Sequence, residues 1–427
     1  VWQVYQASLA DKDEDMFTYA TDIKEENLTK SQETSFYPQY SPDGKEVAFL
    51  KNRTEICVLN LKSGKVRTVM DGKYEYSYQD GDQEYSWSPD SKWILTGYIG
   101  TGGWNHKDQA LVKADGSGEI HNLTNSGYTE YGGKFVLGGK AMLFQSDRSG
   151  YRSHGSWGAE TDVYIMFFDQ KAYEKFLMDK EERELLAEAE KDSKEAKKEE
   201  KAEEKAKKDS ADGKEPKVEP LEFDFDYLDD RTLRLTNVSD NLGDMLLSPD
   251  GDKLYYMAPY NGKMALWVKD LVEEKTELKV PNVGYGSMEM DKDGANIYFL
   301  GMGGIKKIAT ASGSMEDIDF EALYETRPFA QREYLFSHIW KQVKDKFYDP
   351  TFRGMDWKAY FDNYERFLPY INNGYDFSVM VSELLGELNA SHTGCRFYGG
   401  GRASMPVAAL GAFFDPAYEG DGLKFQE

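Results

Sequence analysis

The sequence predicts a mainly β protein: an incomplete β-propeller of about five visible four-stranded blades, followed by a small α-helical segment. Two observations predict this architecture. A short turn motif followed by an apolar strand recurs with a period of about 45 residues, which fits four short strands per blade. After residue 318 the apolar residues change to the spacing of three and four that is typical of amphipathic helices.

The turn motif reads Ser-Pro-Asp-Gly-Lys where it begins at Ser41, and it returns at Ser88 and Ser248. Weaker copies begin at Val136 and Asp291. Proline fixes φ, Asp and Gly favour a tight turn, and an alternating apolar strand follows each copy. Each copy therefore predicts the turn between two strands of one blade.

A second marker has the same register as the turn motif. Leu-Thr pairs end at Thr29, Thr124 and Thr236, each at the same distance ahead of a motif copy. The strand-like sequence ahead of Ser41 is then expected to belong to a further blade. A closed ring needs more blades than these, or a strand from polypeptide upstream of Val1.

The step from Val136 to Ser248 exceeds the repeat by about 65 residues. The excess lies at about 171–220, where the sequence becomes rich in Glu, Lys and Ala. Strong helix formers with interleaved charges predict a solvated helix followed by a disordered loop, with a partner-binding arm as the alternative. Strand-like alternation is expected to return over Leu221–Arg231.

Composition excludes several classes of function. The net charge of −24 opposes binding to nucleic acid, because phosphates would be repelled. Cys57 and Cys395 lie in different predicted domains, so no disulfide framework is expected, and no metal-ligand spacing or cofactor motif is present. Gly102-Gly103 and Gly303-Gly304 fall in predicted blade turns, not ahead of helices, so they are not phosphate loops. No apolar run reaches the length of a membrane span.

Three helices are predicted after the repeats. The first runs over Glu333–Tyr348, the second from about Asp356 to Phe367, and the third begins at a cap formed by Asp376. The third helix places its apolar residues on one face and leads into Asn-Ala-Ser-His-Thr-Gly. That face carries Phe377, Met380, Val381, Leu384, Leu385 and Leu388.

His392 follows Ser391 just past the end of the third helix, where a loop can present a side chain into a cleft. Histidine is the usual base for a serine nucleophile, and a neighbouring serine could orient the imidazole. Taken alone, a histidine at such a position is more often structural than catalytic. The other histidine of this segment, His338, is interpreted as a surface or interfacial residue.

The order of these parts resembles bacterial members of the tricorn protease family. The runs Arg332–Tyr348 and Tyr375–His392 resemble the first catalytic subdomain of that family, and Met405–Gly411 resembles the entry into its PDZ domain. The resemblance covers essentially the whole chain. It implies a propeller with its charged insertion over 1–318, a helical catalytic subdomain over 319–400, and the start of a PDZ-like domain over 401–427.

The resemblance also implies an activity: a serine peptidase that hydrolyses oligopeptides, with the propeller gating access. Ser391 and His392 match the Ser-His pair of the family's catalytic tetrad, which makes His392 the general base and Ser391 its hydrogen-bonding neighbour. The nucleophile and the acidic member belong to a second subdomain after the PDZ domain, beyond Glu427. The chain itself is therefore expected to be inactive.

Two alternatives remain. A peptidase of the prolyl oligopeptidase type would need a G-x-S-x-G elbow, which this sequence lacks. If the protein is instead a propeller scaffold with a helical docking arm, His392 has no catalytic role.

Homo-oligomers are common in such proteases, and the sequence does not distinguish a cytoplasmic from a periplasmic location. The abrupt start at Val1 indicates a chain cut on its N-terminal side or a removed signal peptide.

Overall fold

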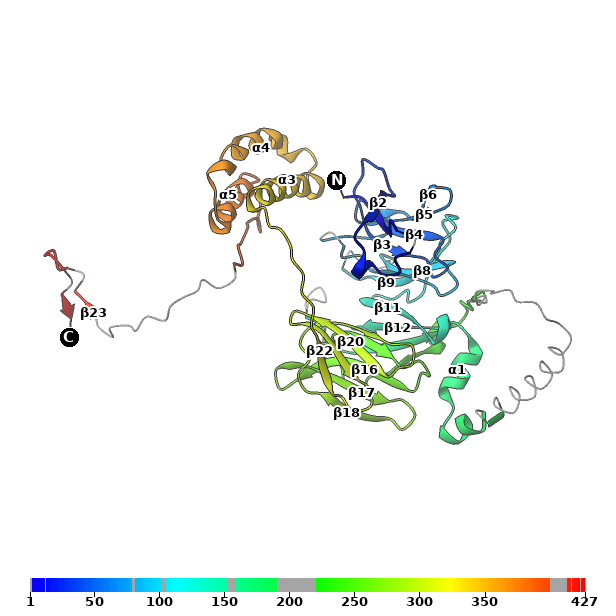
Figure 1. Ribbon diagram of the computed structural model, residues 1–427. Helices are drawn as coiled ribbons and strands as arrows, with labels where there is room; N and C mark the ends of the chain where they lie inside the picture. Colours follow the sequence, from blue (N-terminus) through cyan, green and yellow to red (C-terminus); the bar gives the residue numbers. More distant parts are fainter. Residues whose placement is uncertain are drawn as a thin grey trace. The chain divides into compact units, whose positions relative to one another are not determined.

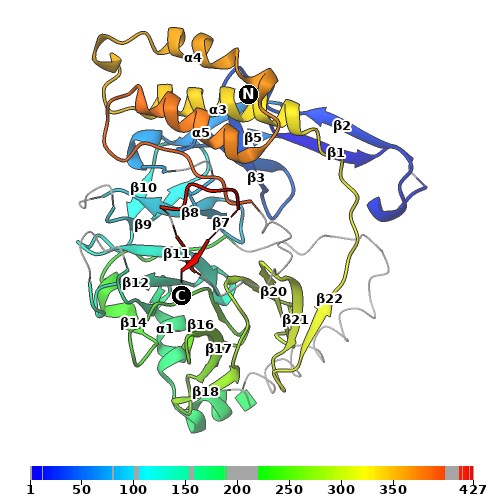
Figure 2. The same ribbon diagram turned by 90° about the vertical axis from the view of Figure 1, so that its left-hand side faces the viewer.

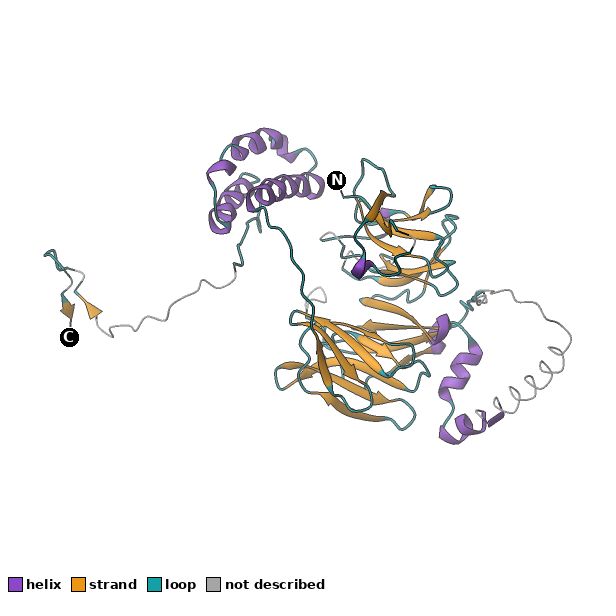
Figure 3. Cartoon of the chain, in the orientation of Figure 1, coloured by secondary structure: helices purple, strands orange, loops and turns teal. Residues whose placement is uncertain are grey.

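The computed structural model describes residues 2–11, 13–78, 81–100, 105–152, 158–186, 188–189, 220–399, 413–415, 417–422 and 424–426. The chain divides into two compact units, Val1–Phe320 and Glu321–Glu427. The first is built mainly from strands and the second mainly from helices (Figure 3). Among the described residues no helix is long and apolar enough to cross a membrane.

The first unit contains five four-stranded sheets in its described part, which confirms the predicted blades (Figure 1). In each sheet the strands pair antiparallel and follow one another in chain order. The sheets are β3 (Ser35–Tyr40), β4 (Glu46–Lys51), β5 (Glu55–Asn60) and β6 (Val66–Met70); β7 (Tyr85–Trp87), β8 (Trp93–Tyr98), β9 (Asp108–Lys113) and β10 (Ile120–Asn122); β11 (Glu130–Val136), β12 (Ala141–Ser146), β13 (Asp162–Phe167) and β14 (Thr232–Arg234); β15 (Met245–Leu247), β16 (Lys253–Tyr260), β17 (Lys263–Asp270) and β18 (Lys275–Val280); and β19 (Gly286–Met290), β20 (Asn296–Gly301), β21 (Gly304–Ala309) and β22 (Met315–Ile318).

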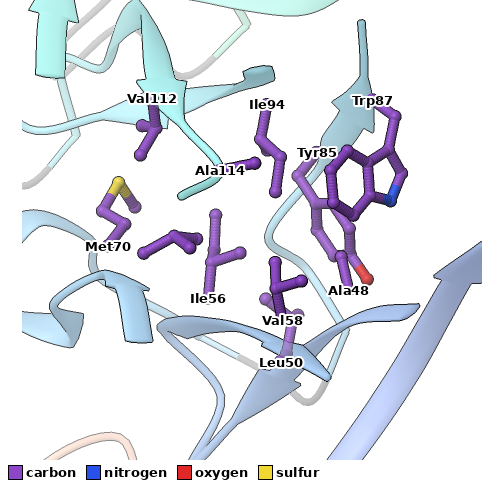
Figure 4. Packing of buried hydrophobic residues seen from close by; sticks show 11 residues of the cluster. Ala48, Leu50, Ile56, Val58, Met70, Tyr85, Trp87, Ile94, Val112 and Ala114 are labelled. Atoms are coloured by element: carbon purple, nitrogen blue, oxygen red, sulfur yellow. The ribbon is translucent and has the colours of Figure 1, made fainter. Parts of the chain in front are cut away.

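Consecutive sheets pack face to face, as the blades of a propeller do. Leu50 of β4 and Ile56 of β5 pack against Ile94 of β8 and Val112 of β9 in one shared core (Figure 4). Similar clusters join each following pair of sheets. The inner strands are buried on both faces, which explains why they read as continuous apolar runs such as Val-Ala-Phe-Leu at 47–50.

The turn motif has a clear physical basis. The Ser41 hydroxyl donates to Asp43 Oδ1 at 2.7 Å and accepts from the Glu46 amide at 3.0 Å, which closes the turn onto the following strand. Ser88 and Ser248 make the same pair of bonds. The last turn position is left-handed, with φ of 67° at Gly44, which is the conformation glycine adopts without cost.

The threonine of the Leu-Thr marker joins the end of the fourth strand of a blade to the start of its third strand. The Thr124 hydroxyl donates to Asp108 Oδ1 at 3.1 Å and accepts from the Gln109 amide at 3.0 Å. Thr236 does the same with Asp162 at 2.6 Å and the Val163 amide at 3.2 Å. The threonine therefore recurs because it satisfies a buried amide and a buried carboxylate in each of these blades.

The sequence before β14 differs from the prediction. Residues 221–227 form no strand, and a short 3-10 helix, η5 (Leu228–Arg231), precedes β14. The alternating apolar pattern of this stretch arises because Phe223 and Phe225 both pack on Trp93, with ring centroids 5.5 and 6.5 Å from the Trp93 ring.

Helix α1 (Gln170–Leu177) begins the charged insertion, whose stretch 190–219 lies outside the described residues.

The second unit contains α3 (Pro328–Lys346), α4 (Trp357–Glu365) and α5 (Gly374–Gly386), which Figure 2 shows together. The 3-10 turns η6 (Phe352–Gly354) and η7 (Leu368–Tyr370) connect them. One core holds the helices together, centred on Phe336, Trp357 and Leu384. A short hairpin, β23 (Phe413–Phe414) and β24 (Phe425–Gln426), follows; Met405–Gly411, assigned above to the entry of a PDZ domain, lies outside the described residues.

Candidate active site

Helix α5 positions the predicted site, and its start corrects one prediction. The N-cap is Asn373, whose side chain accepts from the Asp376 amide at 2.8 Å, so Asp376 is not the cap. Asp376 lies in the first turn, where its carboxylate accepts from Asn373 Nδ2 at 2.7 Å. An acidic residue there also complements the helix dipole. The two side chains fix the start of the helix reciprocally.

The predicted apolar face of α5 is confirmed. Phe377, Met380, Val381 and Leu384 are buried in the core of the unit, and Leu388 just beyond the helix is buried with them. The chain then leaves the helix at Asn389, whose φ of 44° is left-handed. Asparagine tolerates this conformation better than most residues and often ends helices.

The site loop, residues 389–395, is held at its first residue by η6. Arg353 Nη1 donates to the Asn389 carbonyl at 3.1 Å, and Arg353 Nε donates to the Tyr348 hydroxyl at 2.8 Å. The guanidinium also lies 5.5 Å from the Tyr348 ring centroid. The arginine therefore fixes where the chain departs from α5.

The last residue of the site loop is held by α5 itself. The Ser382 hydroxyl accepts from the Cys395 amide at 2.9 Å and donates to the Cys395 carbonyl at 3.0 Å. Between the two anchors, the Thr393 hydroxyl donates to the Ala390 carbonyl at 3.1 Å. A short loop with both ends bonded to helices presents its middle residues in a limited range of positions.

Ser391 and His392 lie at the middle of this loop, and both are exposed. His392 has φ of 62°, a left-handed conformation that costs a non-glycine residue about 1–2 kcal/mol. Within the described residues, neither side chain makes a hydrogen bond, so the imidazole is open to solvent.

The second histidine of the unit, His338, lies on α3 away from the site loop in sequence. It is half-buried and stacks on Tyr334, with ring centroids 5.8 Å apart.

A cavity of about 600 Å³ lies between α5 and the chain that leaves the site loop. Its walls include Tyr375, Glu383, Cys395 and Phe397. The Phe397 ring lies so close to Gly374 that a Cβ there would be 2.2 Å from it, so a larger residue at 374 would displace this wall. A smaller cavity of about 290 Å³ adjoins it and shares Val379 and Glu383.

Two groups near the loop have shifted pKa values. Burial, with a smaller contribution from the hydrogen bond to Glu387, raises the pKa of Tyr364 to about 12. The Tyr364 hydroxyl donates to Glu387 Oε1 at 2.9 Å and so joins α4 to the end of α5. Burial raises the pKa of the Cys395 thiol, which keeps it protonated near neutral pH and disfavours a role as thiolate nucleophile.

No group of three or more His, Cys, Asp and Glu side chains that could hold a metal is found among the described residues.

The loop anchors Arg353 and Ser382 were not predicted from the sequence. Ser382 left no distinctive signal, because α5 carries a second hydroxyl at Ser378 and a charged side chain at Glu383. Arg353 left none, because its role depends on a contact 36 residues along the chain.

Comparisons with known proteins agree with the fold. Residues 328–386 match the tricorn protease C1 domain family, a range that ends just before the site loop. The chain is 23% identical over 389 residues to a protein inferred to be a tricorn-like protease C-terminal subunit in Sulfurisphaera tokodaii, covering 88% of this chain and 41% of that protein. It is 20% identical over 369 residues to a tricorn protease homolog of Saccharolobus solfataricus, covering 83% and 31%.

Among solved structures, the crystal structure of the tricorn protease is similar with a TM-score of 0.58. The identity is 15%, and the match covers 87% of this chain and 34% of that one. The chain thus spans well under half the length of each of these relatives.

Proposed function

On the premise that this chain is a member of the tricorn protease family, we propose that it is part of a serine peptidase that hydrolyses oligopeptides. The proposal of a peptidase is based on the relatives described above, which are named as proteases. The serine mechanism and the oligopeptide substrate are extensions of that assignment to this chain. In this proposal His392 is the general base.

The observation that carries the role of His392 is its presentation. The site loop is anchored to Arg353 at one end and to Ser382 at the other, and it exposes the imidazole at a left-handed residue. A base must reach the proton that it takes, so an exposed ring on an anchored loop suits the task better than a buried one. Ser391 is adjacent in the chain and is proposed to orient the ring during catalysis.

The partner groups are proposed to lie in polypeptide beyond Glu427: the serine nucleophile, the acidic residue and the oxyanion hole. The propeller is proposed to restrict access to peptides, and residues 401–427 to open a PDZ-like domain. The chain of 427 residues alone is then expected to hydrolyse no peptide.

The test uses the intact protein and a fluorogenic oligopeptide. His392→Asn is the sharpest variant, because asparagine tolerates the left-handed backbone but cannot act as a base. We expect kcat/KM to fall by about 10²–10⁴-fold. His338→Asn is the matched control in the same unit, and it should keep near-normal kcat/KM.

Two results would contradict the proposal. The first is a His392→Asn enzyme with the activity of the wild type, which would favour the scaffold alternative for this unit. The second is inhibitor-sensitive hydrolysis by the purified chain of residues 1–427.

A further inference from the structure

Among the described residues of the second unit, left-handed backbone at residues other than glycine occurs in two places. One is the site loop, where φ is 44° at Asn389 and 62° at His392. The other is η6, where φ is 52° at both Phe352 and Arg353, and Gly354 follows with φ of 81°. This conformation is unfavourable for a residue with a Cβ, so two such residues in succession need contacts that hold them.

The carboxylate of Asp349 holds the turn that contains η6, called here the anchor turn (residues 349–355). Its Oδ1 accepts from the Thr351 amide at 2.9 Å and from the Thr351 hydroxyl at 2.7 Å. Its Oδ2 accepts from the Arg353 amide at 2.9 Å. The bond from the Thr351 hydroxyl is the main reason that the pKa of Asp349 lies below its usual value, which keeps the carboxylate ionised at neutral pH. Both oxygens of Asp349 are therefore in use as acceptors.

The side chain of Phe352 ties the anchor turn to the core of the unit. The buried ring stacks on Phe347 and on Trp357, with ring centroids 5.1 and 5.7 Å from its own. The interplanar angles are 14° and 8°. The next residue, Arg353, is exposed. The turn thus has one side chain fixed in the core and the following one free to reach across the surface.

The anchor turn delivers the Arg353 guanidinium to the start of the site loop. Nη1 donates to the Asn389 carbonyl at 3.1 Å, while Nε, at 2.8 Å, and Nη2 both donate to the Tyr348 hydroxyl. Tyr348 therefore orients the guanidinium, and Asp349 fixes the backbone of the same arginine. A planar fork that is bonded along two edges has little freedom, so the Asn389 carbonyl has a well-defined partner.

We propose that Asp349 and Tyr348 are positioning residues for His392, which act through Arg353 and the Asn389 carbonyl. This role rests on the proposed function, because a general base must be held within about 0.5 Å of its productive geometry by a supporting shell. Asn389 lies three residues before His392, so a shift of its carbonyl moves the start of the loop that carries the imidazole. The alternative is that the anchor turn serves only to connect α3 with α4.

The test uses the intact protein and a fluorogenic oligopeptide. Asp349→Asn keeps the shape of the side chain but replaces one acceptor oxygen by an NH₂ group, which cannot accept a hydrogen bond. Arg353→Lys keeps the charge but lacks the fork that bonds Tyr348 and Asn389 together. Each variant should lower kcat by about 10- to 100-fold and leave KM nearly unchanged, because a displaced base weakens the transition state and not substrate binding.

A double-mutant cycle shows whether Asp349 acts through Arg353. If it does, the double variant Asp349→Asn/Arg353→Lys should lower kcat no further than the more damaging single variant. Tyr348→Phe removes the hydroxyl that orients the guanidinium and keeps the ring, so it should also lower kcat with KM unchanged.

Two matched controls carry the same substitutions elsewhere in the unit. Asp356→Asn changes the N-cap of α4, where asparagine caps as well as aspartate does. Arg366→Lys changes an exposed guanidinium that lies 4.9 Å from the Phe367 ring centroid. Both should keep near-normal kcat.

Hydrogen exchange of the same proteins reports the loop without catalysis. The Asn389 amide, which donates to the Gly386 carbonyl at 3.0 Å, should exchange about 10-fold faster in Asp349→Asn and in Arg353→Lys. The Cys395 amide, which donates to the Ser382 hydroxyl at 2.9 Å, should change less and is the internal control.

These readouts separate the positioning role from the proposed function. A normal kcat in Arg353→Lys, or multiplicative losses in the double variant, would overturn the positioning role even where His392→Asn is inactive. Lower stability with unchanged kcat would assign the anchor turn to the connection of α3 with α4 and would overturn it as well. Faster exchange of Asn389 in a protein whose His392→Asn variant is fully active would instead overturn the proposed function, and the positioning role with it. Because Arg353 is exposed, Arg353→Lys decides the matter even if Asp349→Asn does not fold.

Discussion

At the scale of single residues, the candidate site depends on side chains that do no chemistry themselves. Ser382 and Arg353 hold the ends of the site loop, and His392 takes a strained backbone conformation between them. The sequence predicted that His392 lies in a loop just past α5, as the structure shows. It could not predict the anchors, because each acts on a backbone group distant in the chain.

Replacing Ser382 by alanine should loosen the site loop. The substitution removes both hydrogen bonds to Cys395, and we expect a loss of about 1–2 kcal/mol in the stability of the helical unit. Amides 390–395 should exchange faster. Ser378→Ala is the matched control, since its hydroxyl bonds only the Tyr375 carbonyl within α5. Equal loop exchange in the two variants would count against the anchoring role.

The two cysteines should differ in reactivity from free cysteine and from each other. Burial raises the pKa of Cys57 to about 11 and also raises that of Cys395. Since the thiolate is the reactive form, both should be alkylated by iodoacetamide more slowly than free cysteine at pH 7 and faster as pH rises. Cys57, 1% exposed, should be the slower. Labelling of Cys395 faster than free cysteine at pH 7 would contradict this assignment.

At the scale of elements, the repeats predicted the sheets well because one turn motif and one closing threonine recur in chemically equivalent places. Two predictions failed. The alternating aromatic residues Phe223 and Phe225 were predicted to form a strand but pack on Trp93 in a loop. Asp376 was predicted to cap α5, but the cap is Asn373, three residues upstream. At Phe223 and Phe225 tertiary contacts with Trp93 decide the structure. At Asn373 the cause is local, because Asn373 caps the helix by bonding the Asp376 amide three residues on.

The closing threonine gives a prediction at this scale. Thr124→Val leaves the buried Gln109 amide without its acceptor and removes one bond to Asp108, so it should cost about 1–3 kcal/mol. Thr29→Val makes the same change in the hairpin of β1 (Tyr5–Leu9) and β2 (Ile23–Asn27), where Thr29 accepts from the Val4 amide and is only half-buried, so it should cost less. Urea unfolding midpoints compare the two. A larger loss for Thr29→Val would contradict the view that burial sets the difference.

At the scale of the whole molecule, the chain joins a propeller-type unit to a helical unit that matches the tricorn protease C1 domain. It spans 41% of one relative and 31% of another. The proposed chemistry therefore needs groups from polypeptide outside this chain. The net charge of −24 is compatible with peptide substrates and opposes nucleic acid.

The most direct test of the central claim is covalent labelling of the intact protein by a fluorophosphonate, which reports activation of a serine without any peptide recognition. We predict labelling of a serine beyond Glu427, with a rate that falls at least about 100-fold in His392→Asn and stays normal in His338→Asn. An unchanged rate in His392→Asn, or a label within residues 1–427, would contradict the assignment of His392 as the base.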